Sequence, residues 1–331
     1  MAITQEFLDN AGSVNFTDAD SINKYFNDNF KQDFISWFNA NAGGQNFWNS
    51  ITIGKGNINI AADFDNLWSA ENINVFLGNN SISLLQFLCL QSIINNETGG
   101  SLQPRTEMVG RPPDHPGIAY AYDAIPNLKR SYNTLSGNKT CFDLFNNSDY
   151  NNAFGALPLG ADLMNTTDQS WSGEAYPDGI ATSTDPSVTG YILEADFYKF
   201  RGRGLIQTTG RTNYSPIVNF VLNYNGTNSM ILSKKNSWIA LSSDPDVIST
   251  ISTNDDWNDL FMQTNLIIAA KAINVHNHAS GNYLGNISTQ DPATSAASID
   301  KMGLRISGGT TYATLFLNRV TQIIDSMNPA A

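Results

Sequence analysis

The sequence is organised around the stretch Asp196-Phe-Tyr-Lys-Phe-Arg-Gly-Arg-Gly-Leu-Ile-Gln-Thr-Thr-Gly-Arg-Thr-Asn-Tyr214. Two of its glycines alternate with Arg201 and Arg203, and the polar run that begins at Gln207 follows an apolar pair. Glycine allows a backbone to approach a ligand closely, while arginine, glutamine and threonine bind hydroxyl and amide groups. We therefore interpret this stretch as the wall of a site for a polar substrate. The alternative interpretation is a basic surface turn.

The composition indicates a folded chain that does not bind nucleic acid. Of the 331 residues, 41% are hydrophobic and 11% aromatic, which favours a packed core over disorder. The net charge of −12 disfavours nucleic acid and anionic membrane surfaces as partners, because phosphate contacts need a basic face. No apolar run approaches the ~18 residues that a membrane span needs.

Hydrophobic periodicity predicts a mainly α chain. The i, i+4 spacing of four phenylalanines from Phe26 to Phe38 predicts one amphipathic helix that covers the core, with a docking face as the alternative. The strongest helical pattern runs from Ile82 to Thr98, where two glycines stop it. Further helices are expected from a cap at Ser69, from Ser215 with Pro216 in the first turn, after Asp244, and over 257–274, 293–304 and 313–327.

Neither a metal site nor a cofactor is expected. His276 and His278 have no cysteine or acidic residue near them at metal-ligand spacing. Cys89 lies within an apolar helical pattern, which favours simple packing over a disulfide with Cys141. Residues 111–195 are rich in proline, glycine, serine and threonine, and we interpret them as substrate-facing loops with short helices.

Two carboxyl groups are candidates for acid–base chemistry. Glu97 falls at the C-terminal end of the most apolar helix, and both apolar surroundings and the helix end favour a protonated carboxyl. A general acid needs that form. Glu107 follows after a Gly-Gly turn and a short loop, so the two carboxyls are expected to face each other across a groove. Residues 197–214 contain no carboxyl group, and Asp196 only borders them.

At four places the residues resemble a known family. Asn95-Asn-Glu-Thr-Gly-Gly100, the stretch 196–214, Asp244-Pro-Asp-Val and Ile306-Ser-Gly-Gly309 with Arg319 occur in the order seen in glycoside hydrolase family 19. This family includes chitinases and endolysins of the lysozyme superfamily. The resemblance covers about residues 64–327. It implies a mainly α, lysozyme-like, two-lobed domain with a substrate groove at 64–331, interrupted by an insertion at 111–195 and preceded by an extension at 1–63.

The resemblance also implies roles for individual residues. Glu97 matches the general acid, and Glu107 matches the base that activates water in the endolysin branch. Because the family inverts the anomeric configuration, the two carboxyls are expected about 6.5–9.5 Å apart. Substrate binding is implied for Arg201 and Arg203, which match groove-supporting arginines, and for Gln207, Thr209, Asn213, Tyr214 and Ser307.

The chain departs from the family pattern at several positions. Asn96 replaces the usual histidine before the acid but can still donate a hydrogen bond. Ser307 replaces an asparagine, which shortens one substrate contact, and Thr208 replaces an apolar residue. The base of plant chitinases lies farther along than Glu107, where this chain has no carboxyl, so Glu174 and Glu194 remain as alternatives.

The implied function is hydrolysis of β-1,4 bonds in peptidoglycan, with chitin as the alternative substrate. The spacing of Glu107 and the Gly210-Arg211 pair favour peptidoglycan. The N-terminal residues lack the basic and apolar regions of a signal peptide. We therefore expect synthesis in the cytoplasm and action on the cell wall after lysis, or as part of a virion or injection particle.

Two further interpretations stay open. Residues 1–63 are interpreted as a region that docks onto structural proteins of a phage or contractile injection device. An interpretation of another class makes the chain an inactive structural or glycan-binding component of such a particle. The residues at 96 and 307 permit it, whereas the retention of Glu97 and Glu107 argues against it.

Overall fold

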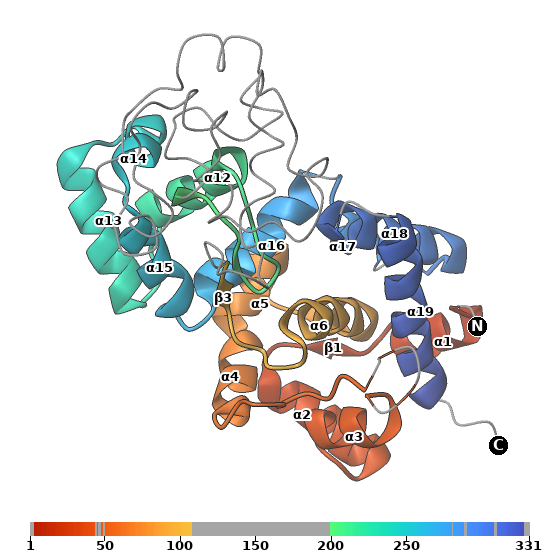
Figure 1. Cartoon of the computed structure of the whole chain (residues 1–331). Helices are drawn as coiled ribbons and strands as arrows, with labels where there is room; N and C mark the ends of the chain where they lie inside the picture. The colour runs from red at the N-terminus through yellow and green to blue at the C-terminus, as the bar shows by residue number, and fades with distance from the viewer. Residues whose placement is uncertain are drawn as a thin grey trace, which may run out of the picture. The chain divides into compact units, whose positions relative to one another are not determined.

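The computed structural model describes residues 3–107 and 199–327, apart from positions 44, 46, 47, 49, 280, 288, 289, 308 and 309. These residues are mainly helical, as the sequence predicts, with two short two-stranded sheets (Figure 1). The chain divides into two compact units, one formed by residues 1–104 and 265–331 and the other by residues 105–264. Residues 3–63 therefore share a compact unit with the C-terminal helices.

The phenylalanine stripe near the N-terminus forms two helices, not the single helix expected. α1 (Gln5–Ala11) precedes α2 (Ala19–Phe30) and α3 (Phe34–Asn41). Lys31 ends α2 in the left-handed conformation, with φ of 61°, and Asp33 then caps α3. Phe26, Phe34 and Phe38 still face the core and are fully buried. The Phe34 ring centroid lies 4.8 Å from that of Phe87.

α6 (Leu84–Thr98) is the central helix of this unit. It begins two residues later than expected because Ile82–Ser83 form strand β2, which pairs antiparallel with β1 (Asn15–Phe16). A capping box formed by Ser83 and Gln86 starts the helix, and Gly99 ends it with φ of 60°. All its residues are buried except Asn96 and Glu97. The candidate acid thus lies at the one place where this helix reaches the surface.

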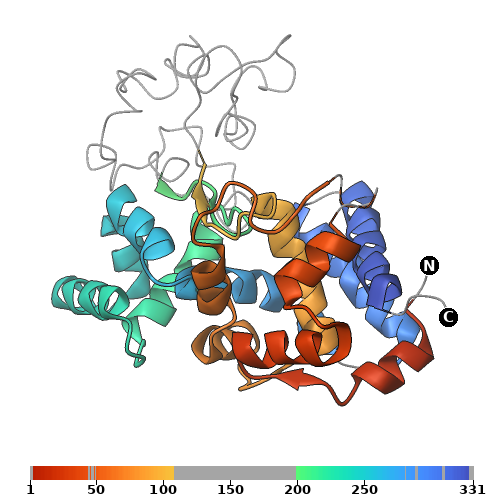
Figure 2. The ribbon, with the colours of Figure 1, turned by 90° about the horizontal axis from the view of Figure 1, so that it is seen from below.

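Helices from both ends of the chain complete the unit, drawn in red to gold and in blue in Figures 1 and 2. Ser69 caps α5 as expected, and α19 contacts both α3 and α6, while α16 contacts α5. The helices of this group are α4 (Ile60–Leu67), α5 (Ala70–Leu77), α16 (Ile267–His278), α17 (Tyr283–Asn286), α18 (Pro292–Ser307) and α19 (Thr310–Met327).

The second unit is built around buried aromatic rings. Strand β3 (Arg105–Thr106) pairs antiparallel with β4 (Arg203–Gly204). Tyr214 and Trp257 are fully buried, with ring centroids 4.7 Å apart. The helices of this unit are α12 (Arg211–Leu222), α13 (Ser229–Leu241), α14 (Pro245–Ile251) and α15 (Asn254–Met262), coloured green to cyan in Figure 1.

Several further helix boundaries differ from the sequence predictions. The helix expected over 257–274 is interrupted, because Asn265 and Leu266 adopt positive φ angles of 51° and 66° between α15 and α16. α12 begins four residues earlier than expected, at Arg211, so Pro216 lies inside the helix. The cap at Asp244 forms as expected, with Pro245 in the first turn of α14. None of the described helices is long and apolar enough to cross a membrane.

Candidate functional site

Glu97 lies in the last turn of α6 and is partly exposed. The Tyr312 hydroxyl donates a hydrogen bond to Glu97 Oε1 at 2.5 Å. The Asn96 side-chain amide donates to the same oxygen at 3.0 Å and to the Tyr312 hydroxyl at 2.7 Å. Among the described residues, all hydrogen bonds to this carboxyl fall on Oε1. The sequence predicts apolar surroundings for Glu97, but the structure supplies two polar donors.

Tyr312 and Arg319 reach this region from α19. Burial raises the pKa of the Tyr312 phenol well above its ordinary value, and the charge and hydrogen bond of Glu97 raise it further. The phenol therefore stays protonated at neutral pH and remains a donor. Arg319 is 3% exposed, and its guanidinium lies 5.0 Å from the centre of the Trp48 ring. Burial lowers the pKa of Arg319, while the nearby Tyr312 and Glu97 oppose that effect.

The second candidate, Glu107, follows strand β3 and is partly exposed. Its backbone N–H donates to the Gly202 carbonyl at 2.7 Å, and its Oε2 accepts from the Gly202 N–H at 3.2 Å. A Cβ atom added at Gly202 would lie 2.9 Å from Glu107 Oε2 and 2.9 Å from Gln207 Oε1. Glycine at 202 therefore makes room for a carboxylate and an amide beside the backbone.

The segment after Gly202 folds into a tight turn. Backbone hydrogen bonds of 3.1 and 2.9 Å join Arg203 to Thr208 in both directions. Gly204 and Gln207 within the turn have φ angles of 87° and 54°, and glycine adopts such angles without strain. Thr208 is fully buried, and its hydroxyl has no hydrogen-bond partner among the described residues. The turn leaves Gln207 partly exposed next to the Glu107 carboxylate.

The two arginines of the stretch support its shape. Arg201 is 6% exposed and Arg203 is fully buried. The Asn254 side-chain oxygen accepts from both guanidinium groups, at 2.6 Å from Arg201 and 2.7 Å from Arg203. Arg201 Nε also donates to the Glu107 carbonyl at 3.0 Å. Both guanidinium groups are therefore hydrogen-bonded to neighbouring groups of the protein.

Tyr214 lies in the interior of the second unit. It is fully buried, and its hydroxyl donates to the Arg201 carbonyl at 2.7 Å. Burial raises the pKa of its phenol, and the positive charge of Arg203 opposes this increase. Its neighbour Asn213 is partly exposed and donates to the Thr209 carbonyl at 2.8 Å. Gln207, Thr209 and Asn213 are thus the residues of the expected binding set that keep some exposure in this segment.

Several expected site residues lie outside this description. Ser307 is the last residue of α18, and the structure describes only its backbone. Asp196, Glu174 and Glu194 fall outside the described residues, as does the whole insertion at 111–195. Glu97 belongs to the first compact unit and Glu107 to the second.

Sequence reasoning missed Tyr312 and Asn254. Tyr312 reaches Glu97 from 215 residues away, and Asn254 reaches the arginines from 51 and 53 residues away. Both contacts depend on how helices pack, and no local sequence pattern predicts them. Asn254 is the first residue of α15, next to the capping Thr253, and this position gives no indication of an arginine partner.

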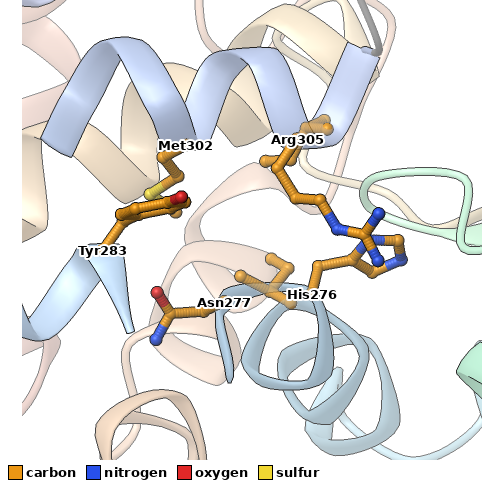
Figure 3. A pocket seen from close by; sticks show the side chains of 7 residues that line it. His276, Asn277, Tyr283, Met302 and Arg305 are labelled. Carbon is orange, nitrogen blue, oxygen red and sulfur yellow. The ribbon is translucent and has the colours of Figure 1, made fainter. Parts of the chain in front are cut away.

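The first unit contains a small pocket, and neither Glu97 nor Glu107 lines it (Figure 3). Burial lowers the pKa of His276 from its ordinary 6.5 to about 4, and the positive charge of Arg305 adds to this effect. His276 is therefore neutral near pH 7. Among the described residues no group of three His, Cys, Asp or Glu side chains could hold a metal ion. The pocket is lined by Ile273, His276, Asn277, Tyr283, Met302, Arg305 and Ile306.

No protein-family profile matches the chain, and neither a curated protein nor a solved structure is significantly similar to it.

Proposed function

We propose that this chain is a glycoside hydrolase that cleaves β-1,4 bonds of peptidoglycan, with Glu97 as general acid and Glu107 as general base. The observation that carries the proposal is the contact between Glu107 and Gly202. This contact joins the candidate base to the segment that the sequence links to substrate binding, across 95 residues. The partly exposed Gln207 and its neighbours Thr209 and Asn213 supply the polar groups that a sugar would contact.

The proposed reaction consumes one water molecule. Glu97 gives its proton to the glycosidic oxygen as the bond from that oxygen to the anomeric carbon breaks. Glu107 takes a proton from a water molecule, whose oxygen bonds to the same carbon from the opposite face. Glu97 is then a carboxylate and Glu107 an acid, and proton exchange with solvent restores both. This inverting mechanism requires the two carboxyls to be about 6.5–9.5 Å apart.

The same residues leave two other functions to be tested. Chitin shares the β-1,4 bond and the N-acetylglucosamine unit, so a chitinase is the alternative of the same class. An inactive glycan-binding or structural component of a phage or contractile particle is the alternative of another class. For any of these, residues 1–63 would dock to a particle through their outer, asparagine-rich surface, since their aromatic face lies in the core.

The experiment compares purified wild-type protein with Glu97→Gln and Glu107→Gln on peptidoglycan sacculi and on colloidal chitin. We expect the rate of each variant on sacculi to fall at least 100-fold, on the order of what general acid–base catalysis contributes. Glu6→Gln, at an exposed glutamate of α1, is the control and keeps full activity. NMR of freshly released reducing ends should show the α-anomer.

The possible results separate the three functions. Hydrolysis of chitin alone replaces the peptidoglycan proposal with a chitinase. Activity on neither polymer, or equal rates in wild type and Glu97→Gln, removes the enzyme proposal and favours the structural one. Full activity in Glu107→Gln assigns the base to another carboxyl.

A further inference from the structure

The first unit holds a hydrogen-bonded triangle formed by Asn96, Glu97 and Tyr312. Its three sides are the 2.5 Å bond from the Tyr312 hydroxyl to Glu97 Oε1, the 3.0 Å bond from Asn96 to the same oxygen, and the 2.7 Å bond from Asn96 to the Tyr312 hydroxyl. Because the Asn96 amide donates to the phenol oxygen, the phenol hydrogen is left to point at Glu97. The triangle therefore fixes the direction of each donor.

The two carboxyl oxygens of Glu97 differ in their hydrogen bonds. Oε1 accepts both hydrogen bonds, and among the described residues no donor bonds to Oε2. A proton on Oε1 would compete with two donors for the same lone pairs, so a protonated Glu97 carries its hydrogen on Oε2. Tyr312 remains a donor because its phenol stays protonated.

From this geometry we infer that Tyr312 is a positioning residue for acid catalysis: its hydroxyl holds Glu97 Oε1 so that Oε2 presents the proton. The inference rests on the proposed function. It adds a residue outside the motifs that link the chain to glycosidases, since Tyr312 lies beyond the Ile306-Ser-Gly-Gly309 segment.

The chemistry gives Tyr312 a role in the transition state as well as in the resting carboxyl. As the proton leaves Oε2, negative charge develops over both oxygens of Glu97. A donor that is already aimed at Oε1 stabilises that charge without rearrangement. Loss of the hydroxyl therefore weakens Glu97 as an acid and also lets the carboxyl turn.

The test uses Tyr312→Phe in the full chain, which keeps the ring and removes the hydroxyl. We expect kcat on the polymer to fall about 10- to 100-fold, as for one hydrogen bond to a charged group, with little change in KM. The alkaline limb of the pH–rate profile should move up by about one pH unit, because the carboxylate loses a donor. Tyr25→Phe, at a tyrosine of α2 that does not touch Glu97, is the matched control.

A titration that needs no turnover accompanies the kinetics. Glutamate labelled with ¹³C at the carboxyl reports protonation by NMR, and the signal of Glu97 is assigned by its absence in Glu97→Gln. Its midpoint should rise in Tyr312→Phe and stay in place in Tyr25→Phe. Asn96→Ala, which removes the second donor, should shift the same midpoint in the same direction.

Each result decides the inference. The inference is overturned if the wild type is active and Tyr312→Phe has the same kcat and the same alkaline pH limb. It is also overturned if Tyr312→Phe is slower but its pH limb and its NMR midpoint do not move, because that result would indicate a merely structural tyrosine. An inactive wild type, with Glu97→Gln equally inactive, shows instead that the proposed function fails, and the positioning role fails with it.

Discussion

Glu107 and Gly202 form two hydrogen bonds with each other, from backbone N–H to carbonyl at 2.7 Å and from the Gly202 N–H to the carboxylate at 3.2 Å. The pairing continues the ladder of β3 and β4 by one more residue pair, so the carboxylate and the turn that follows Gly202 form one local structure. A substitution at either residue should therefore displace the other.

Gly202→Ala should displace Glu107. The added Cβ would lie 2.9 Å from the carboxylate oxygen and from the Gln207 side-chain oxygen, so both side chains must move. We expect a loss of about 1–3 kcal/mol in the free energy of unfolding, as for overpacking, and a large loss of hydrolysis. Gly56→Ala separates this effect from backbone strain, because Gly56 has φ of 74° but no atom within 4 Å of the added Cβ. The Gly56→Ala variant should lose about 1 kcal/mol in the free energy of unfolding and keep its activity. Equal activity in both variants would contradict the steric argument.

Asn254→Ala should destabilise the second unit. Its side-chain oxygen is shared by two buried guanidinium groups, and their desolvated N–H groups would lose an acceptor. The expected loss is about 2–4 kcal/mol, measured by urea denaturation. Asn254→Asp keeps an acceptor and should recover most of this stability. The exposed Asn236 of α13 provides a control, since Asn236→Ala should stay within about 0.5 kcal/mol of wild type. A similar small effect at position 254 would show that other groups hold the arginines.

His276 should make the protein less stable in mild acid. Its pKa is about 4 in the folded chain and 6.5 in its ordinary state, so between these values the unfolded chain binds a proton that the folded chain does not. Stability therefore rises with pH across this window and falls as pH drops from 6.5 towards 4, by up to about 3 kcal/mol. Urea denaturation at several pH values should show a smaller acid loss in His276→Gln. The same substitution at the exposed His278, two residues along α16, should leave the profile as in wild type.

Phe87→Ala should unfold the N-terminal helices together with α6. The Phe87 ring is fully buried and lies near the rings of Phe16, Phe34 and Trp68. Removing it should lower the free energy of unfolding by about 3–5 kcal/mol. Ile58→Ala, at a side chain that is 97% exposed, should have almost no effect. Hydrogen exchange of the α2 amides provides the contrary outcome. If these amides were as protected in Phe87→Ala as in wild type, residues 3–63 would be stable on their own.

Local sequence signals predicted the helices well but not what joins them. The caps at Ser69 and Asp244 and the glycine stop after Thr98 formed as expected, because each depends on a few adjacent residues. The breaks at Lys31 and at Asn265–Leu266 were missed, since apolar periodicity continues through both and these residues adopt the left-handed conformation without glycine. Periodicity reports which side chains face the core, and two consecutive helices can share one such pattern.

The candidate site was predictable only where a motif states it. Glu97 was singled out at the end of the most apolar helix and Glu107 after the Gly-Gly turn, and the structure gives each a defined set of partners. The expected binding residues differ in their exposure to solvent: Arg203 and Tyr214 are buried, while Gln207 is partly exposed. A polar residue in a motif either supports the segment or contacts a ligand, and the sequence does not distinguish the two. That distinction depends on neighbours such as Asn254, which come from elsewhere in the chain.

The first compact unit is discontinuous, since it takes residues 1–104 from one end of the chain and 265–331 from the other. During synthesis, α6 leaves the ribosome long before α16 and α19, the helices that complete its unit. Glu97 gains the hydroxyl of Tyr312 only after a further 215 residues have been synthesised. A nascent chain that stops before Tyr312 would therefore carry the carboxyl without its partner, so under the proposed function the site matures only after α19 has been synthesised.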